Sequence, residues 1–281
     1  MPELEEIRAE FRARPIDGSV NLAGHATDTT PFAPDEDDAE DEVEGGDLAE
    51  ELYDQHELLF AENERSILLI LQGLDASGKN GTIKHVIINV NPAGVRVAEF
   101  EEPTEEEQKE HFLERYKREL PSTGTLGVFA RSHYEDIIVP VVDGELDEAG
   151  WQERCEEINA WEKELVEGGT TVVKCMLHIS YDEQRYRFLR RLRRDDKRWK
   201  FSEADIDTRR QWNDYLSAYG RAIGATSTDH APWYIIPSDH KWYRNWIISH
   251  LLIGTLKDMG PAYPMPELDL EALRARLEPP N

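Results

Sequence analysis

Cysteine is almost absent from this chain of 281 residues, which has only Cys155 and Cys175. Two cysteines are too few for a disulfide framework, and such scarcity is typical of proteins from a reducing compartment. The sequence also lacks an apolar run long enough to span a bilayer, and residues 1–6 have neither the basic nor the apolar region of a signal peptide. These absences predict a cytoplasmic protein without a membrane partner.

Positive charge is scarce as well, since 32 lysines and arginines stand against 58 aspartates and glutamates. The formal net charge of −26 argues against bulk affinity for nucleic acid. Two explanations of the acidity stay open: hydration in a salt-rich cytoplasm, and the high solubility of an ordinary acidic enzyme. The histidines show no His-x-x-x-His spacing and the cysteines no Cys-x-x-Cys spacing, so the sequence does not support a structural zinc site.

Composition divides the chain into three regions. Residues 1–46 are rich in proline, glycine and acid, and the stretch 35–44 is almost wholly carboxylate, so we expect an extended acidic arm. One large α/β domain is expected over residues 47–262, where an initial helical pattern is followed by alternating strands and helices. Residues 263–281 are expected to form a tail with a short helix.

The fold class follows from short apolar segments with helical patterns between them. The segments predicted as strands are Ile67–Leu71, Val95–Phe100, Leu126–Phe129, Thr171–Leu177 and Trp233–Ile236. Helices are predicted near residues 79–90, 104–118, 133–142, 148–167, 182–194, 205–224 and 240–258. Uninterrupted apolar runs are typical of parallel strands covered on both faces. The alternation predicts a doubly wound, five-stranded parallel sheet flanked by helices, with ligands at the carboxyl ends of the strands.

The first predicted strand leads into the sequence G-L-D-A-S-G-K, from Gly73 to Lys79, and then into a helix. This is the context of a P-loop, in which backbone N–H groups surround phosphate oxygens and the lysine reaches the transferred phosphate. The predicted loop residues are Gly73, Ala76, Ser77, Gly78, Lys79, Asn80, Gly81 and Thr82. The alternative is a glycine turn that only links strand to helix.

Asn80 stands where the usual P-loop motif carries a Mg²⁺-binding serine or threonine. Another group must therefore hold the metal. Asp75, inside the loop, is the candidate, because a carboxylate there can bind Mg²⁺ or orient a bridging water.

The third predicted strand ends in a second set of charged residues. Ala130 offers no acidic group where a P-loop kinase commonly has one, but Arg131 follows it directly. Arg131 is expected to stabilise charge on a transferring phosphoryl group, and Glu135 and Asp136 to serve as metal or substrate ligands. The alternative is that the two carboxylates only cap the start of a helix.

A basic segment runs from Arg185 to Lys200, with nine basic and two acidic residues, a local charge of nine minus two, or +7. Arginines three and four residues apart share a helical face and can grip several phosphates through forked hydrogen bonds. The predicted polyanion-binding residues are Arg187, Arg190, Arg191, Arg194, Lys197 and Lys200. The alternative is a solvated helix face whose charges pair with nearby carboxylates. Lys241 and Arg244, at the start of the last predicted helix, could also reach phosphate.

Six motifs together resemble the type-2 polyphosphate kinases, over about residues 50–262 and in the order of that family. They are G-L-D-A-S-G-K-N-G-T-I-K (73–84), N-P-A-G-V (91–95), F-A-R-S-H-Y-E-D (129–136), K-R-W-K-F-S (197–202), R-R-Q-W-N-D-Y (209–215) and A-P-W-Y-I-I-P (231–237). The best fit is the subgroup termed class III. Ala130 departs from the family pattern, because related sequences usually have Asp or Asn there.

The resemblance implies a P-loop kinase domain over residues 47–262 with a basic helical lid at about 182–205. In that family inorganic polyphosphate donates its terminal phosphoryl group, reversibly, to a nucleoside mono- or diphosphate such as AMP, ADP or GDP. The implied roles are metal binding and acceptor positioning for Asp75, charge neutralisation for Lys79 and Arg131, and acceptance of AMP as well as ADP for Glu135. We also take Glu135 as a metal ligand, Mg²⁺ or alternatively Mn²⁺ as the cofactor, and a homodimer or homotetramer as the assembly.

Two other functions stay open. An ATP-dependent P-loop nucleotide kinase would share the fold and the loop, but a site for one ATP does not need nine basic lid residues. A non-catalytic binder of polyphosphate or nucleotides would explain Asn80 and Ala130, but not the presence of Asp75, Lys79 and Arg131 together.

Overall fold

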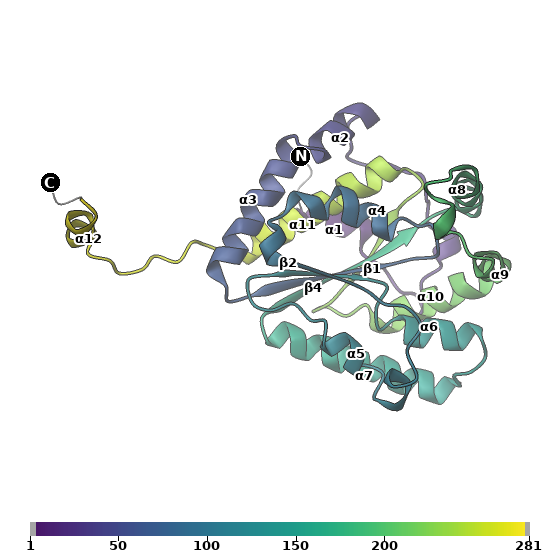
Figure 1. Ribbon diagram of the computed structural model, residues 1–281. Helices are drawn as coiled ribbons and strands as arrows, with labels where there is room; N and C mark the ends of the chain where they lie inside the picture. The colour runs from purple at the N-terminus through teal and green to yellow at the C-terminus, as the bar shows by residue number, and fades with distance from the viewer. Residues whose placement is uncertain (1–3, 279–281) are drawn as a thin grey trace.

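The computed structural model describes residues 4–278. At its centre lies a five-stranded, all-parallel sheet with the order β2-β3-β1-β4-β5 (Figure 1). The strands are β1 (Ser66–Gln72), β2 (Val95–Glu99), β3 (Leu126–Ala130), β4 (Thr170–His178) and β5 (Trp233–Pro237). The predicted α/β fold and each predicted strand segment are confirmed.

Helices cover both faces of this sheet (Figure 1). One face carries α1 (Leu4–Phe11), α2 (Glu36–Val43), α3 (Asp47–Glu62), α4 (Lys79–His85) and α11 (Lys241–Met259). The other face carries α5 (Glu114–Lys117), α6 (Glu135–Val142), α7 (Glu148–Glu167) and α10 (Trp212–Thr226). Helices α8 (Tyr181–Arg193) and α9 (Ala204–Arg210) follow the carboxyl end of β4. Short 3-10 helices occupy Leu22–Gly24, Ile87–Asn89, Pro92–Gly94, Glu107–Lys109 and Arg198–Lys200.

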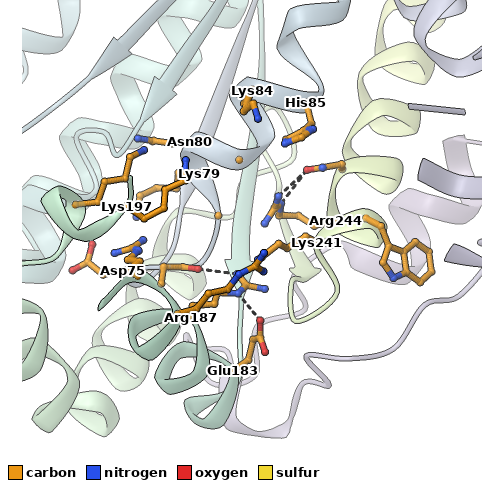
Figure 2. Close-up of a pocket in the computed structure, with 18 of the residues that line it drawn as sticks. Asp75, Lys79, Asn80, Lys84, His85, Glu183, Arg187, Lys197, Lys241 and Arg244 are labelled. Carbon is orange, nitrogen blue, oxygen red and sulfur yellow. Dashed lines mark hydrogen bonds and ion pairs between the residues drawn. The ribbon is translucent and has the colours of Figure 1, made fainter. Parts of the chain in front are cut away.

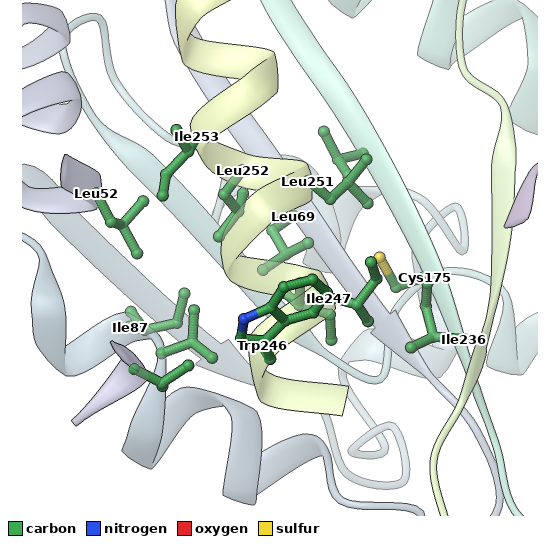
Figure 3. Close-up of a cluster of buried hydrophobic side chains, with 14 of the residues drawn as sticks. Leu52, Leu69, Ile87, Cys175, Ile236, Trp246, Ile247, Leu251, Leu252 and Ile253 are labelled. Carbon is green, nitrogen blue, oxygen red and sulfur yellow. The ribbon is translucent and has the colours of Figure 1, made fainter. Parts of the chain in front are cut away.

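The side chains of β1 alternate between two hydrophobic cores. Leu69 and Leu71 belong to the core beneath α11, whereas Leu68 and Ile70 belong to the core beneath α7 and α10. Figure 3 shows Leu69 among the apolar side chains of α11. Burial of a leucine or isoleucine side chain contributes about 1.5–3 kcal/mol. Strand β1 is therefore held firmly at the point where it delivers the chain to the loop at Gly73.

The amino-terminal region is not the extended arm that its composition predicts. Helix α1 buries Ile7 and Phe11, and helix α2 buries Ala39 and Val43, each pair four residues apart. Asp35 caps α2 by accepting a hydrogen bond from the backbone N–H of Asp38 at 3.0 Å. Carboxylates in the first turn are favourable there, because the amino end of a helix carries partial positive charge. The expectation that residues 1–46 form an extended arm is wrong. A few apolar residues on one face are enough to pack an acidic helix against the core.

Residues 12–31, here called the strap, wrap around the edge of the sheet at β5. Ala13 donates its N–H to the carbonyl of Trp233 at 2.8 Å, and Val20 donates to the carbonyl of Gly220 at 2.9 Å. A Cβ on Gly220 would lie 2.2 Å from the carbonyl oxygen of Val20, so only glycine permits this approach of strap and α10. An edge strand covered in this way cannot pair with another chain.

Three predicted helices differ from those observed. The expected helix near 79–90 is divided into α4 and the 3-10 helix Ile87–Asn89. The expected helix at 104–118 is reduced to Glu107–Lys109 and α5, because its glutamates repel one another and only Leu113 and Tyr116 are fully buried. The expected helix at 205–224 is two helices, α9 and α10, interrupted at Gln211.

The carboxyl-terminal α12 (Leu270–Leu277) projects away from the body and buries no residue (Figure 1). No helix within residues 4–278 is long and apolar enough to cross a membrane. The division at residues 47 and 263 stays a prediction.

Candidate phosphate-binding site

A cavity of about 1040 Å³ lies at the carboxyl ends of the strands, between the loop after β1 and helix α8 (Figure 2). Ligands of open parallel sheets bind at this edge. The basic lining residues are Lys79, Lys84, Arg131, Arg187, Arg190, Arg191, Arg194, Lys197, Lys200, Lys241 and Arg244. Acidic residues line it too, among them Asp75, Glu99 and, from α2, Glu36, Glu40 and Glu44. So much positive charge in one cavity of a protein with net charge −26 suits a polyanion.

The loop between β1 and α4 has the strand–loop–helix context of a P-loop. Asp75, Ala76, Gly78, Lys79, Asn80 and Gly81 line the cavity, whereas Gly73, Ser77 and Thr82 are not among the lining residues. Gly78 adopts a φ of 119°, and a Cβ there would lie 1.8 Å from Nη1 of Arg244. Position 78 must therefore be glycine for the Arg244 guanidinium to rest against the loop.

Lys79 begins α4 and points back across the loop. Its Nζ donates a hydrogen bond to the carbonyl of Gly73 at 2.6 Å. Burial lowers the pKa of Lys79, and the nearby Arg131 lowers it further, while the Asp75 carboxylate opposes the shift. Lys79, Asp75 and Arg131 thus lie close enough to interact electrostatically, as the predicted transfer site requires.

Arg131 follows β3 directly and faces the loop. Its Nη2 donates to Oδ1 of Asp75 at 3.2 Å, and its backbone N–H donates to the carbonyl of Leu71 at 3.1 Å. Arg131 has a φ of 63°, an uncommon conformation for a residue with a side chain. Strain of this kind is held in place by the surrounding structure and is concentrated at functional sites.

Glu135 lies at the start of α6 and is half-buried. Burial raises the pKa of Glu135, Arg131 and Lys79 oppose that shift, and Asp75 adds to it. No group of three or more His, Cys, Asp or Glu side chains within residues 4–278 could hold a metal ion. Mg²⁺ commonly takes one or two carboxylates together with substrate phosphates. Asp75 lines the cavity and Glu135 is not among its lining residues, but the two carboxylates are near enough for Asp75 to raise the pKa of Glu135.

Ala130, the departure from the family pattern, is completely buried at the end of β3. Its partner in register on β2 is Glu99, which lines the cavity. Glu99 also lies near the loop, because Nδ2 of Asn80 donates to its Oε1 at 3.4 Å. A carboxylate from the neighbouring strand is thus present beside the position where Ala130 supplies none.

The carboxyl-terminal half of α8 and the segment after it present the predicted basic residues to the cavity. Arg190, Arg191, Arg194, Lys197 and Lys200 all line it. Arg194 makes two hydrogen bonds to the carboxylate of Asp196, at 3.0 and 2.8 Å, in an exposed pair. Arg191 lies 3.7 Å from the carboxylate of Asp205 on α9. The exposed pair of Arg194 and Asp196 is weak in water, so a polyanion can compete with this carboxylate for the arginine. The pair of Arg191 and Asp205 is half-buried.

Arg187 differs from the other basic residues of α8, because only 5% of it is exposed. Its guanidinium donates to four backbone carbonyls and to the carboxylate of Glu183, and this arrangement is visible in part in Figure 2. These contacts use the guanidinium N–H donors of Arg187 that were predicted to bind phosphate.

The cavity also contains basic residues outside the predicted set. Figure 2 shows Lys84 and His85 on α4, and Lys241 and Arg244 on α11. Lys241 and Arg244 were predicted to reach phosphate, whereas Lys84 and His85 were not among the predicted site residues. The available signal is helical spacing, because residues three and four positions after Gly81 lie on the face of α4 that carries the loop.

A P-loop at the end of β1, with Arg131 directly after the neighbouring strand β3 and a basic helix across the cavity, defines the class of P-loop phosphotransferases. Residues 35–263 match the family model described as Polyphosphate kinase 2 (PPK2). The chain belongs to the polyphosphate kinase 2 family.

Individual relatives agree with this assignment. The chain is 47% identical over 217 residues to the AMP/ADP-polyphosphate phosphotransferase of Meiothermus ruber, covering 77% of this chain and 81% of that protein. It is 39% identical to the ADP-polyphosphate phosphotransferase of Rhodopseudomonas palustris, covering 76% and 78%. The crystal structure of Polyphosphate Kinase 2 from Arthrobacter aurescens TC1 superposes with a TM-score of 0.91 at 36% identity, covering 98% and 96%. The whole sheet and its helices are therefore shared with a solved member.

Proposed function

We propose that this protein transfers the terminal phosphoryl group of inorganic polyphosphate to AMP or ADP, reversibly, as a polyphosphate:AMP/ADP phosphotransferase. The single observation that carries the proposal is the row of basic residues on and after α8 that faces the P-loop across one cavity. A polyphosphate chain can contact the whole row of cations at once, whereas the triphosphate of one ATP can contact only part of it. The names of the two relatives at 47% and 39% identity support the same donor.

The chemistry needs positioning and charge neutralisation more than covalent catalysis. Lys79 and Arg131 neutralise the equatorial oxygens of the transferred phosphoryl group: Arg131 donates to Asp75, and Lys79 lies within electrostatic range of both residues. The backbone of Ala76 and Gly78 lines the same space. Arg190, Arg194, Lys197 and Lys200 bind the rest of the donor chain and bring its end to the loop.

Asp75 and Glu135 are the residues that would hold Mg²⁺, or Mn²⁺ in its place. When bound, the metal would neutralise charge on the donor and acceptor phosphates. Asp75 also positions the acceptor by its place inside the loop, and its contact with Arg131 orients that guanidinium.

Glu135 and the class III resemblance favour AMP as well as ADP as acceptor, and GDP belongs to the same substrate class. The proposed assembly is a homodimer or homotetramer, and the proposed location is the cytoplasm. Light scattering on the purified protein measures the assembly.

The decisive experiment incubates the protein with polyphosphate, Mg²⁺ and AMP, ADP or GDP in turn, at low and high salt, and separates the nucleotides by chromatography. We expect ADP and ATP from AMP, and ATP from ADP. The same incubation with ATP in place of polyphosphate tests the rival nucleotide kinase. Nucleotide binding without any new nucleotide in any lane, with Mg²⁺ or Mn²⁺, would identify a non-catalytic binder instead.

A further inference from the structure

The carbonyl oxygens of the P-loop are held from outside by side chains of α8 and α11. Gln184 donates its Nε2 to the carbonyl of Asp75 at 2.9 Å. Arg187 donates Nη1 to the carbonyls of Ala76 and Ser77 at 2.8 and 2.9 Å. Three successive loop carbonyls are thus fixed by the first two turns of the helix that also carries the basic residues.

The same arginine holds a second loop. Nη2 of Arg187 donates to the carbonyls of Ser238 and Asp239, at 2.5 and 2.9 Å, where the chain passes from β5 to α11. Its Nε donates to Glu183 one turn earlier, at 2.6 Å. A guanidinium has five N–H donors, and these contacts number five. None of its donors is left for a phosphate oxygen in this arrangement.

Arg244 supports the loop from α11. Its Nη1 lies 3.3 Å from the carbonyl of Ser77, and its guanidinium is fixed by Oδ1 of Asn245 at 2.8 Å. Only 2% of Arg244 is exposed. Two buried cations therefore form part of the cavity wall with guanidinium groups that donate to carbonyls of the loop.

We propose that Gln184, Arg187 and Arg244 form a brace that holds the phosphate-binding loop in its working conformation, and that Arg187 is a positioning residue rather than a polyphosphate ligand. In a planar peptide unit the C=O and the following N–H point in opposite directions. Fixing the carbonyls of Asp75 and Ser77 therefore turns the N–H groups of Ala76 and Gly78 away from the brace. Donors that are oriented in advance stabilise developing charge without reorganising during the reaction.

The proposal distinguishes Arg187 from Arg190, which lies on the same helix and lines the same cavity. A ligand of the polyanion acts through affinity, so its loss raises KM for polyphosphate, with an effect that varies with salt and donor length. Loss of the brace lowers kcat instead, and kcat falls by the same factor for short and long polyphosphate donors. Arg185, an exposed arginine of α8 that is not among the cavity's lining residues, is the matched control.

The test compares Arg187→Gln, Arg187→Lys and Arg185→Gln with the parent protein. We expect kcat to fall about 100-fold in Arg187→Gln, as when a preorganised donor is removed from a transition-state site. KM for polyphosphate should stay near the parent value at every donor length and at low and high KCl. Arg187→Lys should not restore kcat, because an ammonium cannot reach the same carbonyls as a planar fork, whereas added guanidinium ion should restore part of it in an Arg187→Ala variant. Arg185→Gln should match the parent.

Hydrogen exchange provides a second measurement that does not depend on turnover. It is needed because the comparison of kcat and KM rests on the proposed function. Hydrogen exchange of the amides in residues 73–82 should be about 10-fold faster in Arg187→Gln, since hydrogen bonds to a charged donor are lost, and unchanged in Arg185→Gln. A parent protein without turnover would refute the proposed function, while the exchange data would still test the brace. Unchanged kcat and loop exchange with a length-dependent rise in KM would overturn the brace and make Arg187 a polyphosphate ligand.

If Arg187→Gln does not fold, the variant Gln184→Met tests the proposed brace instead. This change removes the amide donor to Asp75, and with it the Oε1 acceptor of Arg209, at similar volume, and leaves both buried arginines in place. Faster exchange in the loop and a lower kcat at unchanged KM are expected. Parent values for both would overturn the proposal.

Discussion

The Nζ of Lys174 lies 2.6 Å from Oε2 of Glu162, and both side chains are completely buried. The pair is shared with Tyr134, whose hydroxyl donates to Oε1 of Glu162 at 2.6 Å and accepts from Lys174 at 2.8 Å. Lys174 also donates to the carbonyl of Thr226 at 2.8 Å. The network ties β4, α7 and α10 to the segment after β3 that carries Arg131.

Removing one partner of this network should destabilise the fold strongly. Lys174→Met leaves the Glu162 carboxylate buried without its cation, which costs about 3–5 kcal/mol of unfolding free energy. The double variant Lys174→Met with Glu162→Leu should recover most of that loss, because neither charge remains. Urea unfolding of the three proteins checks the prediction. A double variant no more stable than the single one would contradict it.

Lys79→Ala and Arg131→Ala should each abolish phosphoryl transfer. Each variant removes one of the two cations near Asp75, and loss of such a cation lowers kcat by about 10³-fold or more. Turnover is measured with polyphosphate and ADP, and folding by thermal unfolding. Lys163→Ala, an exposed change on α7, is the control. Full activity in Lys79→Ala would remove that lysine from the site.

Arg190→Ala should act mainly on binding of the donor. Arg190 lines the cavity one turn beyond the buried Arg187. Loss of a charged hydrogen bond to phosphate should raise the apparent KM for polyphosphate about 10-fold at low salt, with a smaller change in kcat. The effect should shrink in molar KCl, because the screening length falls to about 3 Å. Initial rates at several donor lengths and salt concentrations measure it.

Polyphosphate affinity should fall as the pH rises from 7 to 9. Burial, with the nearby Arg187 and Arg190, lowers the pKa of Lys241 to about 8. Lys241 therefore loses its charge in this interval when free, whereas a bound polyanion favours the charged form and raises the pKa. Binding near pH 8 should take up protons, which calorimetry in buffers of different ionisation enthalpy detects. Lys241→Met should lose this proton uptake, and an equal uptake in that variant would assign it to another group.

The sequence predicted the sheet because its signals are local. Apolar runs such as Leu68–Leu71 are buried on both faces, as parallel strands require, and a glycine-rich loop between strand and helix is a local motif. The same reasoning placed Asp75, Lys79 and Arg131 together, because parallel strands end at one edge.

What could not be predicted depends on packing between distant segments. Composition suggested an extended acidic arm, but burial of Ile7 and Phe11 against α11 is a tertiary effect that charge counts do not contain. In the same way, a row of arginines on one helix does not show that Arg187 faces backbone carbonyls while Arg190 faces the cavity. Periodicity identifies a face, but it does not identify the neighbours of that face.

The contact between the strap and α10 limits how far the chain can be truncated at its amino-terminal end. The family match begins at residue 35, yet the strap lies before it and its backbone rests on Gly220. A fragment trimmed to the matched residues 35–263 would expose the edge of β5 and the apolar surface that Ala13, Val20 and Leu22 cover. The folding unit is therefore longer than the segment that the family model matches, and surface attachment or fusion belongs at the projecting helix α12 instead.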